Sequence, residues 1–276
     1  MAESKVMDRE KLKYLVKLID DESEEVRNNV LFELYHYGPN LEIDLLEFSG
    51  SLSKSNRKLL EPIINSNRKN WLRDQWIKKD AIKDDFEKLE YCLNLISKFQ
   101  LGLTVSFEVT SMLDKLAMDF RNYYPYGNEV DLSVYLFQQL GIEGASKDYY
   151  NPMNSNAVYA IRKRKGLPIT LALIYILVGK RCGFHIEGCN FPGHFLARIK
   201  IDNELVLVDC FNGGRLIYKS NIAEFAEDMY DSVMFLIEQE ANINLIIKRV
   251  LANLINAYSK SKQPENAELF QEFLLV

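Results

Sequence analysis

The sequence predicts a mostly helical α+β protein with a small antiparallel sheet of about three strands. Apolar residues recur at three- and four-residue spacing over most of the chain, which is the period of amphipathic helices. That period is lost between Gly183 and Gly214, where short apolar segments alternate with turn residues. The 276 residues, 47% of them hydrophobic, are enough to bury a sizeable core.

The N-terminal part is predicted to be an αα-hairpin. Apolar spacing from Lys11 to Tyr37 favours two helices, and Gly38 ends the second one. Asp21 followed by Glu24 indicates a capping box at the start of the second helix. The hairpin resembles a single HEAT repeat. Because one such unit cannot bury its apolar face alone, we expect it to pack on the rest of the chain.

The middle of the chain has a mixed pattern before the helical period returns. Residues 39–70 include the polar stretch 51–56, which predicts a turn, and this segment is the best candidate for a loose domain boundary. Pro125 with Gly127, and later Gly141, are typical helix ends. Three helices are therefore predicted over residues 80–100, 107–123 and 130–140.

A strongly apolar helix beginning at Pro168 precedes the predicted sheet. Its apolar run, Leu167 to Val178, is well short of the roughly 20 residues that span a membrane, so a buried helix is expected. Two amphipathic helices follow the sheet, and their pattern resembles half of a tetratricopeptide repeat. The strands are predicted over 184–190, 194–201 and 204–209, and the last two helices over 242–258 and 265–274.

Composition argues against several classes of partner. The 34 basic and 39 acidic residues give a net charge of −5, which provides no electrostatic reason to bind nucleic acid or a membrane. The basic run Arg162–Lys165 is interpreted as a solvated loop. The four cysteines lack the spacing of a zinc site or a disulfide framework, so no metal and no cofactor are predicted. The start of the chain does not resemble a secretory signal, and a cytoplasmic protein is expected.

The order of three elements is typical of papain-like cysteine hydrolases and transferases. Their chemistry needs a thiolate at a helix N-terminus, a histidine on a following strand, and an aspartate or asparagine on the next strand to orient that histidine. Here a helix begins at Pro168, His194 lies in the second predicted strand, and Asp209 ends the third. His194 and Asp209 are therefore the candidate pair.

The chain resembles the transglutaminase-like superfamily, from about Asn154 to Arg215. Gly166 to Ala172 reads Gly-Leu-Pro-Ile-Thr-Leu-Ala, which matches the flanking glycine and alanine of that family's nucleophile helix, and Gly183 stands at the helix-closing position. Within the superfamily the bacterial Sir B-type branch is most similar, which implies tetratricopeptide-like helices after the core. The residues that carry this likeness are 154–156, 164–171, 192–196, 208–214 and 251–254.

The resemblance breaks at the nucleophile, where the family has cysteine and this chain has Pro168. Proline suits the first turn of a helix but has no nucleophilic atom. The Thr170 hydroxyl lies about 200° further round the helix and is not expected to point where the thiol would. Cys210 follows Asp209 and faces the other side of its strand, while Cys189 is at no helix N-terminus.

Plainer interpretations compete with the functional ones. His194 and Asp209 are interpreted as a retained structural pair, His194 in the turn 192–194, with Asp209 either its partner or a cap for the turn at 212–214. The tyrosines at 123–126 and the pair Tyr149 and Tyr150 suit a peptide-binding groove or a core equally.

Three regions are predicted: an N-terminal helical region (1–70) with the HEAT-like hairpin, a transglutaminase-like domain (71–235, core 149–216), and a tetratricopeptide-like pair (236–276). The predicted function is a non-catalytic protein-interaction or regulatory module with a degenerate site and a protein or peptide partner. The alternative is a hydrolase or acyltransferase in which His194 and Asp209 activate water or the Thr170 hydroxyl. A third possibility is an architectural adaptor that binds its partner on the N-terminal hairpin. The sequence predicts no oligomeric state.

Overall fold

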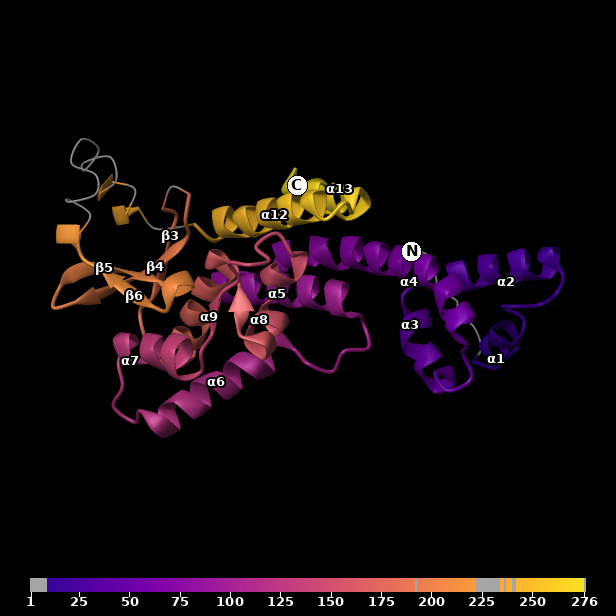
Figure 1. The fold of residues 1–276 in the computed structure, drawn as a ribbon, viewed down its shortest axis with the longest axis horizontal. Coiled ribbons are helices and arrows are strands. Elements are labelled where there is room, and N and C mark those ends of the chain that lie inside the picture. Colours follow the sequence, from indigo (N-terminus) through magenta and orange to yellow (C-terminus); the bar gives the residue numbers. More distant parts are fainter. Residues whose placement is uncertain (1–8, 192, 222–233, 236, 240–241, 276) are drawn as a thin grey trace. The chain divides into compact units, whose positions relative to one another are not determined.

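The computed structural model describes residues 9–191, 193–221, 234–235, 237–239 and 242–275. The fold is mostly helical with small sheets, as predicted (Figure 1). It divides into two compact units. The first contains residues 1–78 and 98–106, and the second contains residues 79–97 and 107–276.

The first unit begins with the predicted hairpin. Helix α1 (Arg9–Lys17) is followed by α2 (Glu24–His36), and Gly38 leaves α2 with a φ of +78°, a conformation that glycine adopts without strain. The sequence predicted Asp21 as the N-cap of α2, and this is wrong by two residues. The N-cap is Ser23, whose side chain accepts a hydrogen bond from the Val26 amide. Asp21 instead accepts a hydrogen bond from the Ser23 amide.

The segment predicted to be a loose boundary is also helical, so that prediction is wrong. It contains α3 (Asn40–Asp44), the 3-10 helix η1 (Leu45–Phe48) and most of α4 (Lys54–Trp76), with η2 (Ile77–Ala81) after it. The predicted turn is the short connection before the Ser53 cap of α4. The helices of the first unit share one apolar core, formed by Leu12, Leu15, Val16, Ile19, Val30, Leu34, Leu41, Leu45, Leu60 and Ile63.

The helical part of the second unit surrounds one buried helix. Helix α9 (Pro168–Arg181) is buried along its length from Pro168 to Gly179, as its sequence predicts. Gly183 follows it with a φ of +75°. The helices around it are α5 (Asp85–Leu101), α6 (Val109–Tyr123), α7 (Glu129–Ser133) with the π-helical turn η3 (Val134–Gln139), the 3-10 helix η4 (Pro152–Ser155) and α8 (Ala157–Lys163). The last residues of α5 belong to the first unit.

The predicted meander is present and has one strand more than expected. Strands β3 (Glu187–Cys189), β4 (Leu196–Ile201), β5 (Glu204–Asp209) and β6 (Arg215–Ile217) form an antiparallel sheet in that order, beside α9 (Figure 1). The register pairs Ala197 with Val208, and Val208 with Leu216. A second, parallel pair, β1 (Glu143–Gly144) and β2 (Lys165–Gly166), was not predicted.

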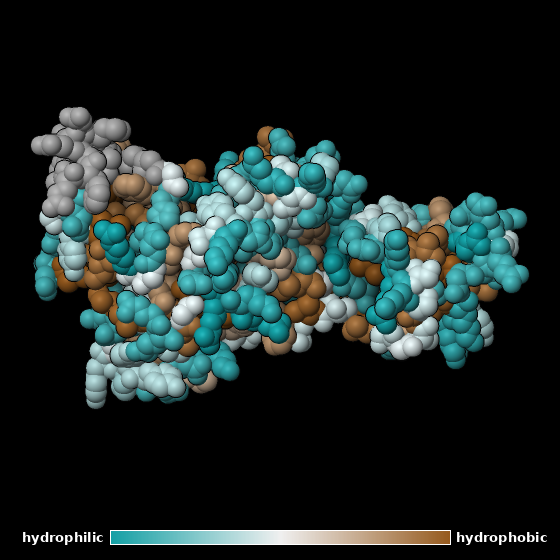
Figure 2. All heavy atoms as spheres, viewed as in Figure 1, coloured by the Kyte–Doolittle hydropathy of each residue, from teal (hydrophilic) through white to brown (hydrophobic). Residues whose placement is uncertain are grey.

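Helices α12 (Ile243–Lys260) and α13 (Pro264–Leu274) end the second unit and lie side by side (Figure 1). α12 packs against η4, and the stacked rings of Tyr258 and Phe270, 5.6 Å apart, join the two helices. On the face seen in Figure 2, hydrophilic residues are spread over the surface with smaller apolar areas between them. In the described part of the chain, no helix is long and apolar enough to cross a membrane.

Candidate functional site

The first residue of α9 is Pro168, and the backbone before it explains why the helix starts there. Leu167 is extended, with φ −73° and ψ 159°, which is the conformation that a following proline favours. The Leu167 amide donates to the Asn154 carbonyl at 3.0 Å, and the Leu171 amide closes the first turn on the Leu167 carbonyl. Pro168 has no amide hydrogen to satisfy and is buried, so the position is well suited to structure and carries no reactive atom.

His194 and Asp209 meet, as the sequence suggested. His194 lies in the turn before β4, not on the strand where it was predicted, and its amide donates to the Phe191 carbonyl at 3.1 Å. Pro192 of the predicted turn lies outside the described residues. Because β4 pairs with β5 in the register Ala197 to Val208, Asp209 lies close to the turn, and its Oδ1 is 2.9 Å from the Nε2 of His194.

Asp209 also holds the turn that follows β5. Its Oδ1 accepts a hydrogen bond from the Asn212 amide at 3.2 Å, and its Oδ2 accepts one from the Asn212 side chain at 2.7 Å. Burial raises the pKa of this carboxyl, but the hydrogen bonds from His194 and Asn212 outweigh burial, so the pKa of Asp209 is lowered. Both roles proposed for Asp209, histidine partner and turn cap, are therefore present together.

The other ring nitrogen of His194, Nδ1, makes no hydrogen bond to any residue that the structure describes. The side chain is 27% exposed. When Nε2 donates to the aspartate, Nδ1 is left as the acceptor, which is the state of a general base. Neither Pro168 nor the buried Thr170 is hydrogen-bonded to this ring.

The native thiols are not activated. All four cysteines are buried. Burial raises the pKa of Cys92 to about 12 and that of Cys189 to about 11. Burial also raises the pKa of Cys182, and it raises that of Cys210 well above its ordinary value. A thiol must ionise to act as a nucleophile, so none of the four can replace the missing cysteine.

A chain of aromatic side chains leads away from the histidine. Phe211, in the 3-10 turn η5 (Cys210–Asn212), lies edge to face with His194 at 6.0 Å and with Tyr149 at 6.2 Å, and Tyr149 lies edge to face with Tyr150 at 5.4 Å. We call these four residues the aromatic cluster. Gly144 leaves room for the Phe211 ring, because a Cβ there would lie 2.6 Å from three ring carbons.

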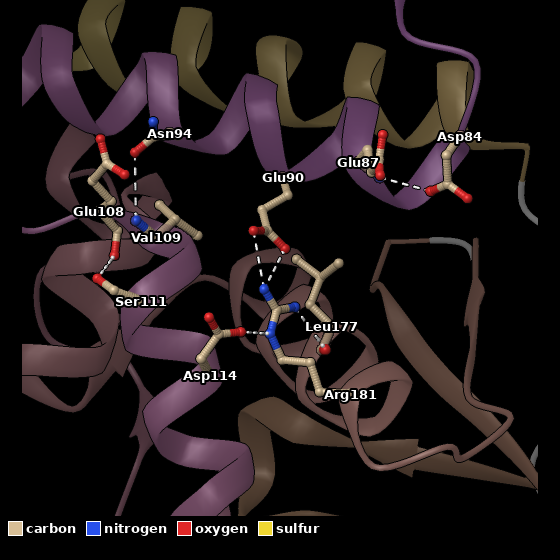
Figure 3. Close-up of polar contacts among 10 residues, drawn as sticks. All are labelled: Asp84, Glu87, Glu90, Asn94, Glu108, Val109, Ser111, Asp114, Leu177 and Arg181. Carbon is tan, nitrogen blue, oxygen red and sulfur yellow. Dashed lines mark hydrogen bonds and ion pairs between the residues drawn. The ribbon is translucent and has the colours of Figure 1, made fainter.

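Two pockets of about 600 Å³ adjoin other parts of the second unit, and neither is lined by His194 or Asp209. They share Phe86 and Lys180. Beside one of them the Arg181 guanidinium donates to Glu90 at 2.8 and 3.0 Å and to Asp114 at 2.5 Å, which ties the end of α9 to α5 and α6 (Figure 3). Because this arginine is neutralised by two carboxylates, we assign it a structural role.

Sequence reasoning did not single out Phe211, Asn212 or Arg249 as functional residues. Phe211 and Asn212 follow Asp209 directly, and the turn residues after them signal that the chain folds back there. Arg249, on α12, is far from the site in the sequence and carries no local signal. In the described residues, no three His, Cys, Asp or Glu side chains gather as a metal site would require.

The family follows from the sequence match over this same region. Residues 107–252, more than half of the chain, match the model of the family described as the transglutaminase-like superfamily. This chain belongs to the transglutaminase-like superfamily. The match covers the helix, the histidine and the aspartate described above, and confirms the superfamily that the motifs suggested.

Individual relatives are similar over part of their length. A UPF0162 protein of Xylella fastidiosa (strain Temecula1 / ATCC 700964) is 37% identical over 139 residues, which are 48% of this chain and 50% of that protein. F-box only protein 21 of Mus musculus is 26% identical over 151 residues, 52% of this chain and 24% of that protein. The chain thus spans about half the length of the first curated relatives it matches. No solved structure matches.

Proposed function

We propose that this chain is a non-catalytic member of its superfamily that binds a protein or peptide segment at the aromatic cluster and the His194–Asp209 pair. One observation carries the proposal: the helix that would present the nucleophile begins with Pro168. A histidine and an aspartate without a nucleophile cannot perform the acyl-transfer chemistry of a cysteine triad.

Half-exposed aromatic side chains support a binding role. Tyr149 is 38% exposed and Tyr150 is 47% exposed, and both belong to the aromatic cluster. Tyrosine offers a large apolar face and a polar end at low entropic cost, which is why it is enriched in protein interfaces. We place the partner surface at this cluster because the cluster includes His194, although the N-terminal hairpin also exposes aromatic rings, those of Tyr14, Phe32 and Tyr35.

The finer family assignments belong to the same proposal. We place the chain in the Sir B-type branch, with α1 and α2 as a HEAT-like hairpin and α12 and α13 as a tetratricopeptide-like pair, in a cytoplasmic protein. The division into 1–70, 71–235 and 236–276 stays a prediction. The matching region is 50% of the length of the UPF0162 protein and 24% of the length of F-box only protein 21. This favours a module that is combined with other segments in different proteins.

Crosslinking and activity together test the proposal. A photo-crosslinking residue replaces Tyr150, and in a matched variant it replaces Tyr126, which is fully exposed in the same unit. We expect crosslinking to one discrete partner from position 150 and not from position 126. We also expect no hydrolysis or transamidation of a glutamine peptide by the wild-type chain. Turnover that His194→Ala abolishes without unfolding the protein would contradict the proposal.

One observation favours the alternative of a hydrolase or acyltransferase. Nδ1 of His194 is unpaired within the described structure, as a base that activates water would require, and the lowered pKa of Asp209 keeps a negative charge on the other side of the ring. This candidate predicts that His194→Gln and Asp209→Asn each lower a hydrolytic rate by 100-fold or more, the usual contribution of a general base. Thr170→Val tests its hydroxyl in the same assay.

A further inference from the structure

Arg249 of α12 reaches the turn that carries His194. Its guanidinium donates a hydrogen bond to the Oδ1 of Asn190, just after β3, and its Cζ lies 5.5 Å from the centre of the Phe195 ring. Asn190 and Phe195 lie on either side of the turn that contains His194. The helix therefore places a cation beside the candidate site.

Other partly buried arginines are held by carboxylates or by backbone carbonyls, as Arg121 is by the carbonyls of Gly127 and Cys182. Arg181 is paired with Glu90 and Asp114, Arg198 with Glu187, and Arg68 with Glu42. Among the residues that the structure describes, Arg249 makes no ion pair and no hydrogen bond to a backbone carbonyl. A guanidinium has five N–H donors, and the Asn190 amide oxygen accepts from only one of the two Nη atoms.

The surroundings of Arg249 make an unpaired charge costly. Burial lowers the pKa of Arg249, and the nearby Tyr149 and Cys189 only partly offset it. In turn, Arg249 opposes the rise that burial causes in the pKa of Tyr149. The two shifts share one cause, the Coulomb interaction between the guanidinium and the Tyr149 hydroxyl. A partly desolvated cation that keeps free donors is stabilised when an anion binds to it.

We infer that Arg249 is the anchor for a carboxylate of the bound peptide, with the aromatic cluster contacting the apolar group next to that carboxylate. The planar fork of a guanidinium fits a carboxylate with two parallel hydrogen bonds. Tyr149 supplies a hydroxyl donor and an aromatic face, and its ring is joined to that of His194 through Phe211. This inference rests on the proposed binding function and specifies the chemistry of the ligand.

The test uses a small probe that carries both groups, hippurate, whose benzoyl ring is one peptide bond from its carboxylate. Its uncharged amide, hippuramide, and phenyl phosphate are the comparison ligands. Binding to the full chain is followed by NMR titration of the wild type, Arg249→Gln and Arg162→Gln. Arg162 is the matched control because it also lies over an aromatic ring, 4.4 Å from the centre of Phe107, but is exposed and on α8.

We expect hippurate to shift the Tyr149 resonances and to bind at least about tenfold more weakly to Arg249→Gln, the effect of losing one charge-assisted hydrogen-bonded pair. Arg162→Gln should bind hippurate with the affinity of the wild type. The affinity of the wild type for hippuramide should be no higher than the affinity of Arg249→Gln for hippurate. Equal binding of hippurate and hippuramide, or tighter binding of phenyl phosphate than of hippurate, would overturn the assignment of a carboxylate.

A second arm uses the partner captured through position 150. Amidation of its C-terminus, and Asp→Asn and Glu→Gln changes in its bound segment, distinguish a terminal carboxylate from a side-chain carboxylate. Loss of binding with any one of these supports the inference. Binding that none of them changes, and that Arg249→Gln leaves intact, refutes the inference while the proposed binding function stands. Hippurate binding through Arg249 without any captured partner would instead count against the proposed function alone.

Discussion

At the scale of single residues, Asp209 links the histidine to the turn after β5. It accepts hydrogen bonds from His194 and Asn212, and its pKa is lowered by them in spite of its burial. A carboxylate with a lowered folded pKa stabilises the fold above its unfolded pKa, and that contribution is lost as the pH falls through the folded pKa. Asp209 is thus a stabilising charge at neutral pH, whatever the site binds.

Asp209→Asn tests this role. We expect the substitution to lower the free energy of unfolding of the second unit by about 1.5 to 3 kcal/mol at neutral pH, the range for hydrogen bonds to a charged group. The difference from the wild type should shrink below about pH 4, where the unfolded carboxyl starts to protonate, and vanish below the folded pKa. Urea unfolding followed by circular dichroism at pH 7, 5 and 3 measures it.

The control for that experiment is Asp202→Asn in the exposed turn between β4 and β5. Asp202 has a φ of +50°, a conformation that asparagine tolerates as well as aspartate. Its replacement should leave the stability nearly unchanged at every pH. A gap between wild type and Asp209→Asn that stays constant from pH 7 to 3 would show that the carboxylate charge is not the stabilising factor.

The sequence predicted the His194–Asp209 contact because His194 begins one segment of the meander and Asp209 ends the next, and antiparallel pairing brings the start of one strand beside the end of the following strand. It did not predict the role of Arg249, because the contact of Arg249 with Asn190 depends on how α12 packs near the end of β3. It left Tyr149 open between core and groove, since burial of a tyrosine is decided by its neighbours. Contacts within a motif can be predicted from the sequence, whereas contacts between distant elements depend on packing.

At the scale of elements, long periodic helices were predicted well and short elements were not. Strand β6 has three residues, and β1 and β2 have two each, too few for an alternating pattern to be visible. Helix α4 was missed because its polar residues dilute the apolar period and Pro62 lies inside it. The start of α9 was predicted at the correct residue because proline is typical of the first helical position.

The start of α9 also allows the lost nucleophile to be restored. In Pro168→Cys the thiol would stand at a helix N-terminus and, if the family arrangement is kept, near Nδ1 of His194. The helix dipole and an imidazolium both favour the thiolate. We expect these two effects to outweigh the burial of position 168, so that alkylation by iodoacetamide at neutral pH is at least about tenfold faster than for an ordinary thiol with a pKa near 8.5. A pKa lowered by more than one unit gives that increase in thiolate.

Lys54→Cys is the matched control, since Lys54 is the first residue of α4 and has no histidine partner assigned. The wild-type chain provides the background, because its four buried cysteines should react only after unfolding. The His194→Ala change in the Pro168→Cys chain should reduce the alkylation rate toward that of Lys54→Cys. Equal rates in all three variants would show that position 168 is not beside the imidazole.

At the scale of the whole molecule, the chain forms two compact units, of which the second contains the candidate site. The sequence placed the end of the N-terminal region at residue 70 and gave no sign that residues 98–106 join the first unit, because compactness depends on which elements share a core. The two tryptophans, Trp71 and Trp76, are both in α4 and belong to the first unit, so tryptophan fluorescence reports on that unit. The unfolding of the first unit can therefore be followed separately from that of the second unit in one sample.

We expect the units to unfold in two distinguishable transitions, because each has its own apolar core. Leu34→Ala empties a fully buried position in the first core and should cost about 2 to 5 kcal/mol there. It should lower the urea midpoint seen by tryptophan fluorescence and leave hydrogen exchange in β4 and β5 unchanged. Leu207→Ala, at an equally buried position of the sheet, should do the reverse. If either substitution shifts both readouts by the same free energy, the chain unfolds as one cooperative unit, and the site cannot be treated as belonging to the second unit alone.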